Sequence, residues 1–211
     1  MPSAKTKKIL ATLRQLYPDA RCGLDYRTPF ELLIATILSA QCTDKRVNLI
    51  TPALFAVANS PEKILKLGEK GLTFYIKTCG LYKAKAKNIL QACRLLVERH
   101  GGKVPEDFEA LTHLPGVGRK TANVVVSNAF DHPAIAVDTH VFRVSRRLGL
   151  ASGKNPHQVE LELQKAIPRP EWSEAHHLFI AHGRGLCSAR SPRCEQCPLT
   201  RICLYYRSSG H

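Results

Sequence analysis

One lysine in this chain lies where its amine could act as a nucleophile. Lys120 follows the run Leu-Pro-Gly-Val-Gly-Arg. It opens a segment whose apolar residues recur at helical spacing: Ala122, Val125, Val126 and Ala129. In the first turn of a helix, the positive end of the helix dipole disfavours an ammonium ion. The sequence therefore predicts a neutral, nucleophilic amine. The alternative is the usual role of a lysine, a solvated surface charge.

A carboxylate further along the chain is the second candidate catalytic group. Asp138 follows the short apolar run 134–137 and precedes a helical pattern that ends at Gly149. Its position is that of a helix N-cap, and capping alone would explain the residue. The two roles are compatible, because a carboxylate that a cap holds rigidly is well placed to face a reaction centre.

Two glycines before the lysine form a candidate anion-binding site. A short helix is expected over 105–114, with Pro105 in its first turn, and the next helix starts after Gly118. Gly116 and Gly118 flank Val117, so backbone N–H groups and the helix dipole can approach a phosphate there. The alternative is a tight turn between two helices that merely needs glycine.

Four cysteines near the C-terminus have the spacing of metal ligands. The pattern is C-x6-C-x2-C-x5-C, formed by Cys187, Cys194, Cys197 and Cys203. Four thiolates suit zinc or an iron–sulfur cluster. Zinc sites usually pair two C-x2-C units. Only one such unit is present, so the wider gaps favour a bulkier cluster, with zinc as the alternative.

Other cysteines and histidines offer no comparable pattern. His176 and His177 are adjacent, so on a helix we expect them to point apart and not to share a metal. Four cysteines lack ligand spacing and are interpreted as small buried side chains: Cys22, Cys42, Cys79 and Cys93.

Charge and composition limit the class of protein. The 211 residues include 31 Lys and Arg against 17 Asp and Glu, a formal net charge of +14. This favours a polyanionic partner, although a basic protein without one is the alternative. The longest apolar run, 32–40, is too short to span a bilayer. The N-terminus lacks a secretory signal, so we expect a reducing, cytoplasmic setting and no disulfides.

The remaining pattern is helical throughout, and no stretch alternates as a strand would. The sequence therefore predicts an all-α protein. The expected helices include one that Pro18 ends, one from Pro29 to Ala40 and one from Asp44 to about Ala58. Further helices are expected on both sides of a break at 68–71, then from Tyr82, after Asp138, after Asn155 and over 171–181.

Two of these motifs together resemble a known family. The run 114–122 (Leu-Pro-Gly-Val-Gly-Arg-Lys-Thr-Ala), with 137–140 (Val-Asp-Thr-His) beyond it, is similar to the endonuclease III family of helix-hairpin-helix DNA glycosylases. The resemblance covers nearly the whole chain.

The resemblance implies two helical domains with the active site between them. One would comprise 22–132 and contain the helix-hairpin-helix at about 105–130. The other would comprise 1–21 and 133–211 and contain the cluster loop 187–203. The cysteines would then hold a four-iron, four-sulfur cluster with a structural and DNA-binding role.

The resemblance also implies an activity. The chain would be a bifunctional DNA glycosylase and abasic-site lyase of base excision repair that removes oxidised pyrimidines. Lys120 would attack the anomeric carbon, form a Schiff base and promote β-elimination of the 3′ phosphate. Asp138 would support the positive charge on the sugar.

By the same resemblance, ten residues would contact DNA. Gln41 would fill the gap left by the extruded base and Leu81 would wedge into the stack, whereas a polar helix end and a buried loop leucine are the ordinary interpretations. At Cys42 the family is expected to carry alanine. The full set is Gln41, Leu81, Gly116, Val117, Gly118, Arg119, Thr121, His140, Arg190 and Arg193.

Two other classes of protein fit the same motifs. One is a glycosylase without lyase activity, although such relatives generally lack a lysine at position 120. The other is a noncatalytic helix-hairpin-helix module, with or without zinc. The favoured prediction is a monomer without membrane attachment, in the bacterial cytoplasm and on the nucleoid, acting on duplex DNA with damaged bases or abasic sites.

Overall fold

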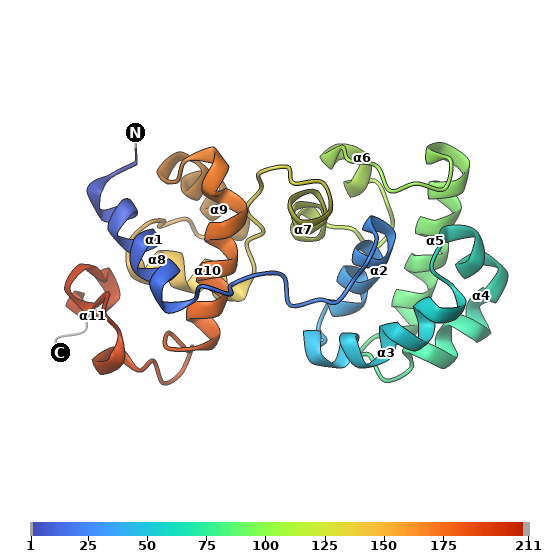
Figure 1. The fold of residues 1–211 in the computed structure, drawn as a ribbon, viewed down its shortest axis with the longest axis horizontal. Coiled ribbons are helices and arrows are strands. Elements are labelled where there is room, and N and C mark those ends of the chain that lie inside the picture. Colours follow the sequence, from blue (N-terminus) through green and yellow to red (C-terminus); the bar gives the residue numbers. More distant parts are fainter. Residues whose placement is uncertain (1, 209–211) are drawn as a thin grey trace. The chain divides into compact units, whose positions relative to one another are not determined.

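The computed structural model describes residues 2–208, and every regular element in that part of the chain is a helix (Figure 1). The expected all-α fold is confirmed. The α-helices are α1 (Ala4–Leu16), α2 (Pro29–Ser39), α3 (Asp44–Val57), α4 (Pro61–Ile76), α5 (Tyr82–His100), α6 (Phe108–Thr112), α7 (Arg119–Ala129), α8 (Thr139–Leu148), α9 (Pro156–Ala166), α10 (Trp172–Arg184) and α11 (Leu204–Ser208). Three short 3₁₀ helices complete the set: η1 (Arg169–Glu171), η2 (Cys194–Gln196) and η3 (Thr200–Ile202).

The chain forms two compact units, which are described separately below. Unit 1 combines Met1–Arg21 with His132–His211, and unit 2 is the continuous segment Cys22–Asp131. Of the candidate catalytic residues, Lys120 belongs to unit 2, whereas Asp138 and the four spaced cysteines belong to unit 1.

Helix α2 forms the centre of unit 2. It is buried on every face from Phe30 to Leu38, and it packs against α3, α5 and α7. Its start is a capping arrangement in which Thr28 Oγ1 accepts a hydrogen bond from the Glu31 amide at 3.2 Å. The Glu31 carboxylate reaches back to the amide of Arg27 at 2.7 Å, so this buried charge is hydrogen-bonded.

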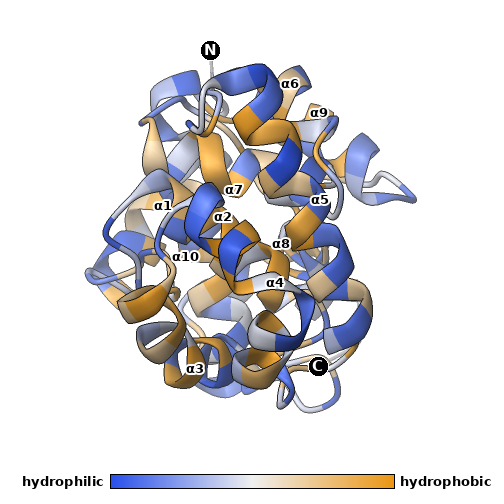
Figure 2. Ribbon diagram, turned by 90° about the vertical axis from the view of Figure 1, so that its right-hand side faces the viewer, coloured by the Kyte–Doolittle hydropathy of each residue, from blue (hydrophilic) through white to orange (hydrophobic). Residues whose placement is uncertain are grey.

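Two residue types that often interrupt helices, glycine and proline, behave differently in unit 2. At Gly68 the backbone leaves the helical region (φ 69°, ψ −179°), so α4 is two helical segments joined by a kink. Pro52 lies inside α3 without dividing it. The α3 ribbon carries both orange and blue segments in Figure 2, as expected for a helix with one buried face.

The core of unit 1 gathers apolar side chains from both ends of the chain. Leu10 and Leu13 of α1 join Val141 of α8 and Phe179 of α10 in one buried cluster. The run 134–137 is buried and leads directly into α8. At the edge of this core, the Arg14 guanidinium pairs with the carboxylates of Glu171 and Glu174, which ties α1 to α10.

Some local expectations were wrong. The helix expected over 105–114 begins only at Phe108, because Asp107 is the N-cap and its carboxylate accepts from the Ala110 amide at 2.8 Å. The last long helix runs to Arg184 rather than 181. The rings of His176 and His177 do not point apart, since their centroids lie 4.0 Å from each other.

None of the helices formed by residues 2–208 combines the length and the apolar character that crossing a membrane requires.

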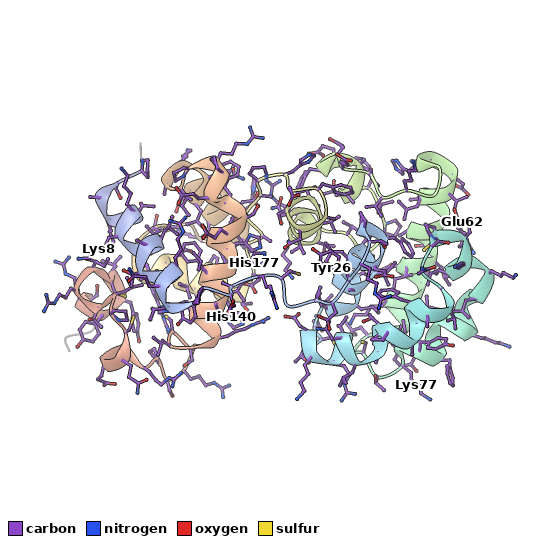
Figure 3. The ribbon with its side chains drawn as sticks, in the orientation of Figure 1. Lys8, Tyr26, Glu62, Lys77, His140 and His177 are labelled. Carbon is purple, nitrogen blue, oxygen red and sulfur yellow. The ribbon has the colours of Figure 1, made fainter. Side chains whose placement is uncertain are left out.

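Burial of one histidine predicts an acid-sensitive contribution to stability. Burial lowers the pKa of His177 on α10 to about 4 (Figure 3), against about 6.5 in an unfolded chain. Because the folded pKa is the lower one, the unfolded state takes up a proton first. The contribution of neutral His177 to the free energy of unfolding is therefore complete above about pH 6.5 and is lost as the pH falls towards 4.

The wild type should lose unfolding free energy between pH 7 and pH 4.5, as measured by urea denaturation. In His177→Gln we expect this loss to be smaller by on the order of 1 kcal/mol. His157→Gln, at an exposed histidine of the same unit, is the matched control. Identical pH profiles for the wild type and His177→Gln would contradict the prediction.

Candidate active site and metal centre

The turn between α6 and α7 fixes where α7 begins. The Val117 amide donates to the carbonyl of Leu114 at 3.0 Å, and the Val117 side chain is 5% exposed. Tyr26, labelled in Figure 3, donates its hydroxyl to the carbonyl of Asn128 at 2.8 Å, which holds the far end of α7. The helix that carries Lys120 is thus anchored at both ends within unit 2.

The two glycines of this turn differ in backbone conformation and in the space around a Cβ atom. Gly116 has φ +82°, and a Cβ there would lie 3.1 Å from Asn88 Cβ and 3.4 Å from Ile37 Cγ2. The fold itself therefore demands glycine at this position. Gly118 is the N-cap of α7 with φ −88°, and a Cβ there would meet nothing within 4 Å. The fold tolerates a side chain at Gly118, so space for an approaching ligand is the better explanation.

Lys120 is exposed in the first turn of α7. That turn contains no acidic residue, and the N-cap provides no side-chain hydrogen bond. Among the described residues of unit 2, no carboxylate pairs with the Lys120 amine. Its neighbour Arg119 places the guanidinium 5.0 Å from the centre of the Phe108 ring. The Lys120 amine is therefore presented on a surface that favours anions.

Asp138 is the N-cap of α8, as expected from its position. Its Oδ1 accepts hydrogen bonds from the amides of His140 and Val141, both at 2.8 Å. Among the described residues of unit 1, no donor contacts Oδ2. The cap thus holds the carboxylate in a fixed orientation through one oxygen and leaves the other available to a partner.

The start of α8 is linked to the cysteine loop through one arginine. Arg143 Nη2 lies 3.2 Å from Nδ1 of His140, the residue labelled on α8 in Figure 3. The same guanidinium donates to the carbonyl of Cys187 at 3.1 Å and to that of Gly183 at 2.9 Å. The carboxylate of Asp138 and the cysteine loop therefore belong to one continuous hydrogen-bonded structure.

Gly183 lets α10 approach α8 closely at this point. A Cβ on Gly183 would lie 2.9 Å from Nδ1 of His140 and 3.1 Å from Nη2 of Arg143. Contacts this short require a neighbour to move, so only glycine fits without displacing the link between the two helices.

All four spaced cysteines line one small cavity with mainly apolar walls. Four thiols around a shared space suit a multi-atom cluster.

The electrostatics of the cysteine loop also fit a bound cluster. Burial raises the pKa of the Cys194 and Cys197 thiols, so a metal is needed to hold them as thiolates. Arg147 Nη1 lies 3.4 Å from Cys187 Sγ and can offset thiolate charge. His182 Nε2 lies 3.8 Å from Cys197 Sγ, and burial lowers the pKa of His182 to about 4, so its ring is neutral.

Gln41 and Leu81 lie on two loops of unit 2 that touch each other. A Cβ on Gly80 would lie 3.2 Å from the Gln41 carbonyl oxygen. Both residues are exposed and adopt the left-handed backbone conformation, with φ 52° for Gln41 and 59° for Leu81. For a leucine this conformation is strained, and Leu81 is 59% exposed, so the buried-loop interpretation is wrong.

The other expected contact residues differ in how free their side chains are. Arg190 is exposed, whereas Arg193 donates to the carbonyl of Gly185 at 2.9 Å and so helps to fold the cysteine loop. Thr121 is half-buried on α7. Outside the expected set, Lys83 and Lys87 on α5 are exposed, whereas the buried Lys85 donates to the carbonyl of Leu38 at 2.7 Å.

Three residues that support the site were not predicted from the sequence. These are Arg143 and Arg147, which reach from α8 to the cysteine loop, and Gly183, which lets α10 approach. One signal was present in the sequence. The two arginines are four residues apart, so they lie on one face of the helix that Asp138 begins.

Comparisons with known proteins agree with the motifs. The chain matches the family model described as HhH-GPD superfamily base excision DNA repair protein over residues 34–169, well over half of its length. Residues 187–203 match the iron–sulfur binding domain of endonuclease III. The expected iron–sulfur centre is thereby confirmed.

Individual relatives match over almost their entire length. The chain is 53% identical to endonuclease III of Haemophilus influenzae and 52% identical to that of Escherichia coli, with 97% of each chain covered in both cases. Two solved structures are each 46% identical. A non-covalent endonuclease III–DNA complex has a TM-score of 0.93 and 99% coverage of both chains. A trapped endonuclease III–DNA covalent intermediate has a TM-score of 0.92 and 100% coverage. This chain therefore belongs to the endonuclease III family within the helix-hairpin-helix superfamily of base excision repair proteins.

Proposed function

We propose that the chain is a bifunctional DNA glycosylase and abasic-site lyase that removes oxidised pyrimidines from duplex DNA. One observation carries the proposal: an exposed lysine in the first turn of α7, two residues after a glycine that the fold does not need. A relative of 46% identity has been trapped as a covalent intermediate with DNA, which supports a nucleophilic side chain at such a site.

In the proposed first stage, the two exposed loops of unit 2 help to extrude the damaged nucleotide. A base inside the stack cannot be reached, and extrusion costs least where pairing is already weakened. Leu81 would enter the stack as an apolar wedge, and Gln41 would occupy the space that the base leaves. Their exposed, left-handed positions support these roles, because strained conformations are retained where function requires them.

The hairpin before α7 would hold the DNA backbone. Amides at a helix start have no acceptor within the helix, and the dipole adds a positive potential. A phosphate could therefore approach Gly118, where no side chain intervenes. Gly116 and the buried Val117 would hold the turn in shape. Arg119 and Thr121 would provide further contacts from the same end of α7.

The proposed chemistry needs one amine and one carboxylate. Asp138 would stabilise the positive charge that develops on the sugar as the base departs, and it would help to take a proton from Lys120. The Lys120 amine would bond to the anomeric carbon and give a Schiff base after ring opening. Loss of a proton from the adjacent carbon would then expel the 3′ phosphate by β-elimination, and water would release the lysine.

The cysteine loop would support this chemistry from a distance. Cys187, Cys194, Cys197 and Cys203 would hold a [4Fe–4S] cluster, which supplies cross-links to a loop with little core of its own. Arg143 would transmit that rigidity to the start of α8, where Asp138 and His140 lie. Arg190 and Arg193 would offer positive charge to DNA phosphates.

We also propose that the chain has two domains, residues 22–132 and residues 1–21 with 133–211. Lys120 of the first domain and Asp138 of the second would act on the same nucleotide of damaged DNA. The high positive charge supports binding to duplex DNA. We further propose that a monomer acts on chromosomal DNA in the bacterial cytoplasm, without attachment to a membrane.

Replacement of the lysine tests the nucleophile. Lys120→Ala should abolish strand cleavage and borohydride trapping on abasic duplex DNA, because no amine remains to form the Schiff base. Binding to the same duplex should persist. Lys154→Ala, at an exposed lysine of unit 1, should trap as efficiently as the wild type. Trapping that survives in Lys120→Ala would show that another amine is the nucleophile. If the chain were a noncatalytic module, neither the wild type nor Lys154→Ala would be trapped on the DNA.

Replacement of the carboxylate separates catalysis from capping. Asparagine is a good N-cap, so Asp138→Asn should keep the start of α8 intact. It removes the negative charge, so single-turnover release of an oxidised pyrimidine should slow by about 10²–10⁴-fold. Circular dichroism and thermal unfolding would check the fold. An unchanged rate in a folded variant would reduce Asp138 to a cap.

The two glycines form a matched pair for testing the phosphate site. Gly118→Ala should change the free energy of unfolding by less than about 0.5 kcal/mol, yet weaken binding to an abasic-site analogue duplex about tenfold. Gly116→Ala should instead lose about 1–2 kcal/mol of stability, because its backbone is left-handed. Wild-type affinity in Gly118→Ala would contradict a phosphate at this helix start.

A further inference from the structure

Two cysteines outside the cluster loop bring their sulfur atoms together in unit 2. Cys42 Sγ and Cys79 Sγ lie 3.7 Å apart, and their thiols form a hydrogen bond. A disulfide requires about 2.05 Å, so the sulfur atoms would need to approach by about 1.6 Å. Each cysteine follows a tight turn, since the Cys42 amide donates to Ser39 and the Cys79 amide donates to Ile76. Movement of this size is within the reach of side-chain and loop adjustment.

We propose that Cys42 and Cys79 form a modification site, a dithiol that a small-molecule disulfide such as glutathione disulfide oxidises reversibly to an intramolecular disulfide. The first exchange joins Cys42 to one glutathione and releases the other as a thiol. Cys79 then attacks the Cys42 sulfur and releases the second glutathione. In total, two protein thiols and one glutathione disulfide give one protein disulfide and two glutathione thiols.

Exposure assigns the order of the two exchanges. Cys42 is partly exposed, whereas Cys79 is 2% exposed, so an oxidant in solution meets Cys42 first. Burial and, to a smaller extent, the neighbouring Cys42 thiol together raise the pKa of the Cys79 thiol to about 11. The cations Lys85 and Arg46 act in the opposite direction and help Cys79 to lose its proton when it attacks.

The remaining cysteines of unit 2 differ from this pair in burial. Cys93 is fully buried, and burial raises the pKa of its thiol to about 12. Cys22 is partly buried. The 3.7 Å separation of the Cys42 and Cys79 sulfur atoms should direct oxidation to this pair.

The bond would connect the two loops that present Gln41 and Leu81. Cys42 is next to Gln41, and Cys79 is two residues before Leu81. The loops already meet where Gly80 lies against the Gln41 carbonyl. A covalent link there would restrict how far the two side chains can separate around an extruded nucleotide. This consequence rests on the proposed function of the two residues, whereas the modification itself does not.

The test uses the cluster-loaded protein and glutathione disulfide, with the visible spectrum confirming that the cluster stays intact. After blocking of free thiols and digestion, mass spectrometry should find a peptide pair linked through Cys42 and Cys79. Dithiothreitol should remove the link. Cys42→Ala should abolish it, Cys79→Ser should stop at a glutathione adduct on Cys42, and the control Cys22→Ser should retain it.

Absence of the linked pair from the folded protein would overturn the proposal, and so would a Cys42 adduct that never resolves while Cys79 is present. If Cys79→Ser fails to fold, the comparison of the wild type with Cys42→Ala still decides. The linked protein should bind an abasic-site analogue duplex about tenfold more weakly, with recovery on reduction. Unchanged affinity would refute the effect on the loops. Gln41→Ala and Leu81→Ala in reduced protein test the proposed DNA contacts separately, because disulfide formation does not depend on them.

Discussion

The proposed chemistry depends on the rigid start of α7, which places the Lys120 amine at the positive end of a helix. The hydrogen bond from Val117 to Leu114 and the left-handed backbone of Gly116 fix the turn before it. An amine on a mobile loop would have to be ordered during each reaction, at a cost in conformational entropy. In this fold the backbone that carries the amine is already ordered before the substrate binds. The same helix start favours anions, so one local structure can hold a phosphate and present a nucleophile.

Unit 1 follows a similar principle by different means. The carboxylate of Asp138 is fixed as a cap, and Arg143 links the cap region to the backbone of the cysteine loop. Arg147 adds further hydrogen bonds to that loop. A cluster bound to the loop would therefore stiffen the region around the carboxylate without touching the substrate. No step of the proposed mechanism transfers electrons, so support of this loop is the role that we propose for the cluster.

Much of the fold could be predicted from the sequence, because local signals determine it. The cap residues Thr28, Asp138 and Asn155 each begin a helix as expected. The long-range contacts could not be predicted this way. These contacts depend on packing between segments that are distant in the sequence. Examples are the contact between the Gln41 and Leu81 loops, the burial of Lys85 against Leu38 and the close approach of two helices at Gly183. The cysteine spacing favoured a cluster but left zinc open, and the match of residues 187–203 to an iron–sulfur binding domain decided between them.

The central claim is that the amine of Lys120 itself bonds to the sugar. The most direct measurement is mass spectrometry of the borohydride-reduced adduct between the wild-type protein and abasic DNA, after digestion of both components. The account predicts that the deoxyribose remnant is attached to Lys120. A remnant on any other lysine, or on the N-terminal amine, would contradict it.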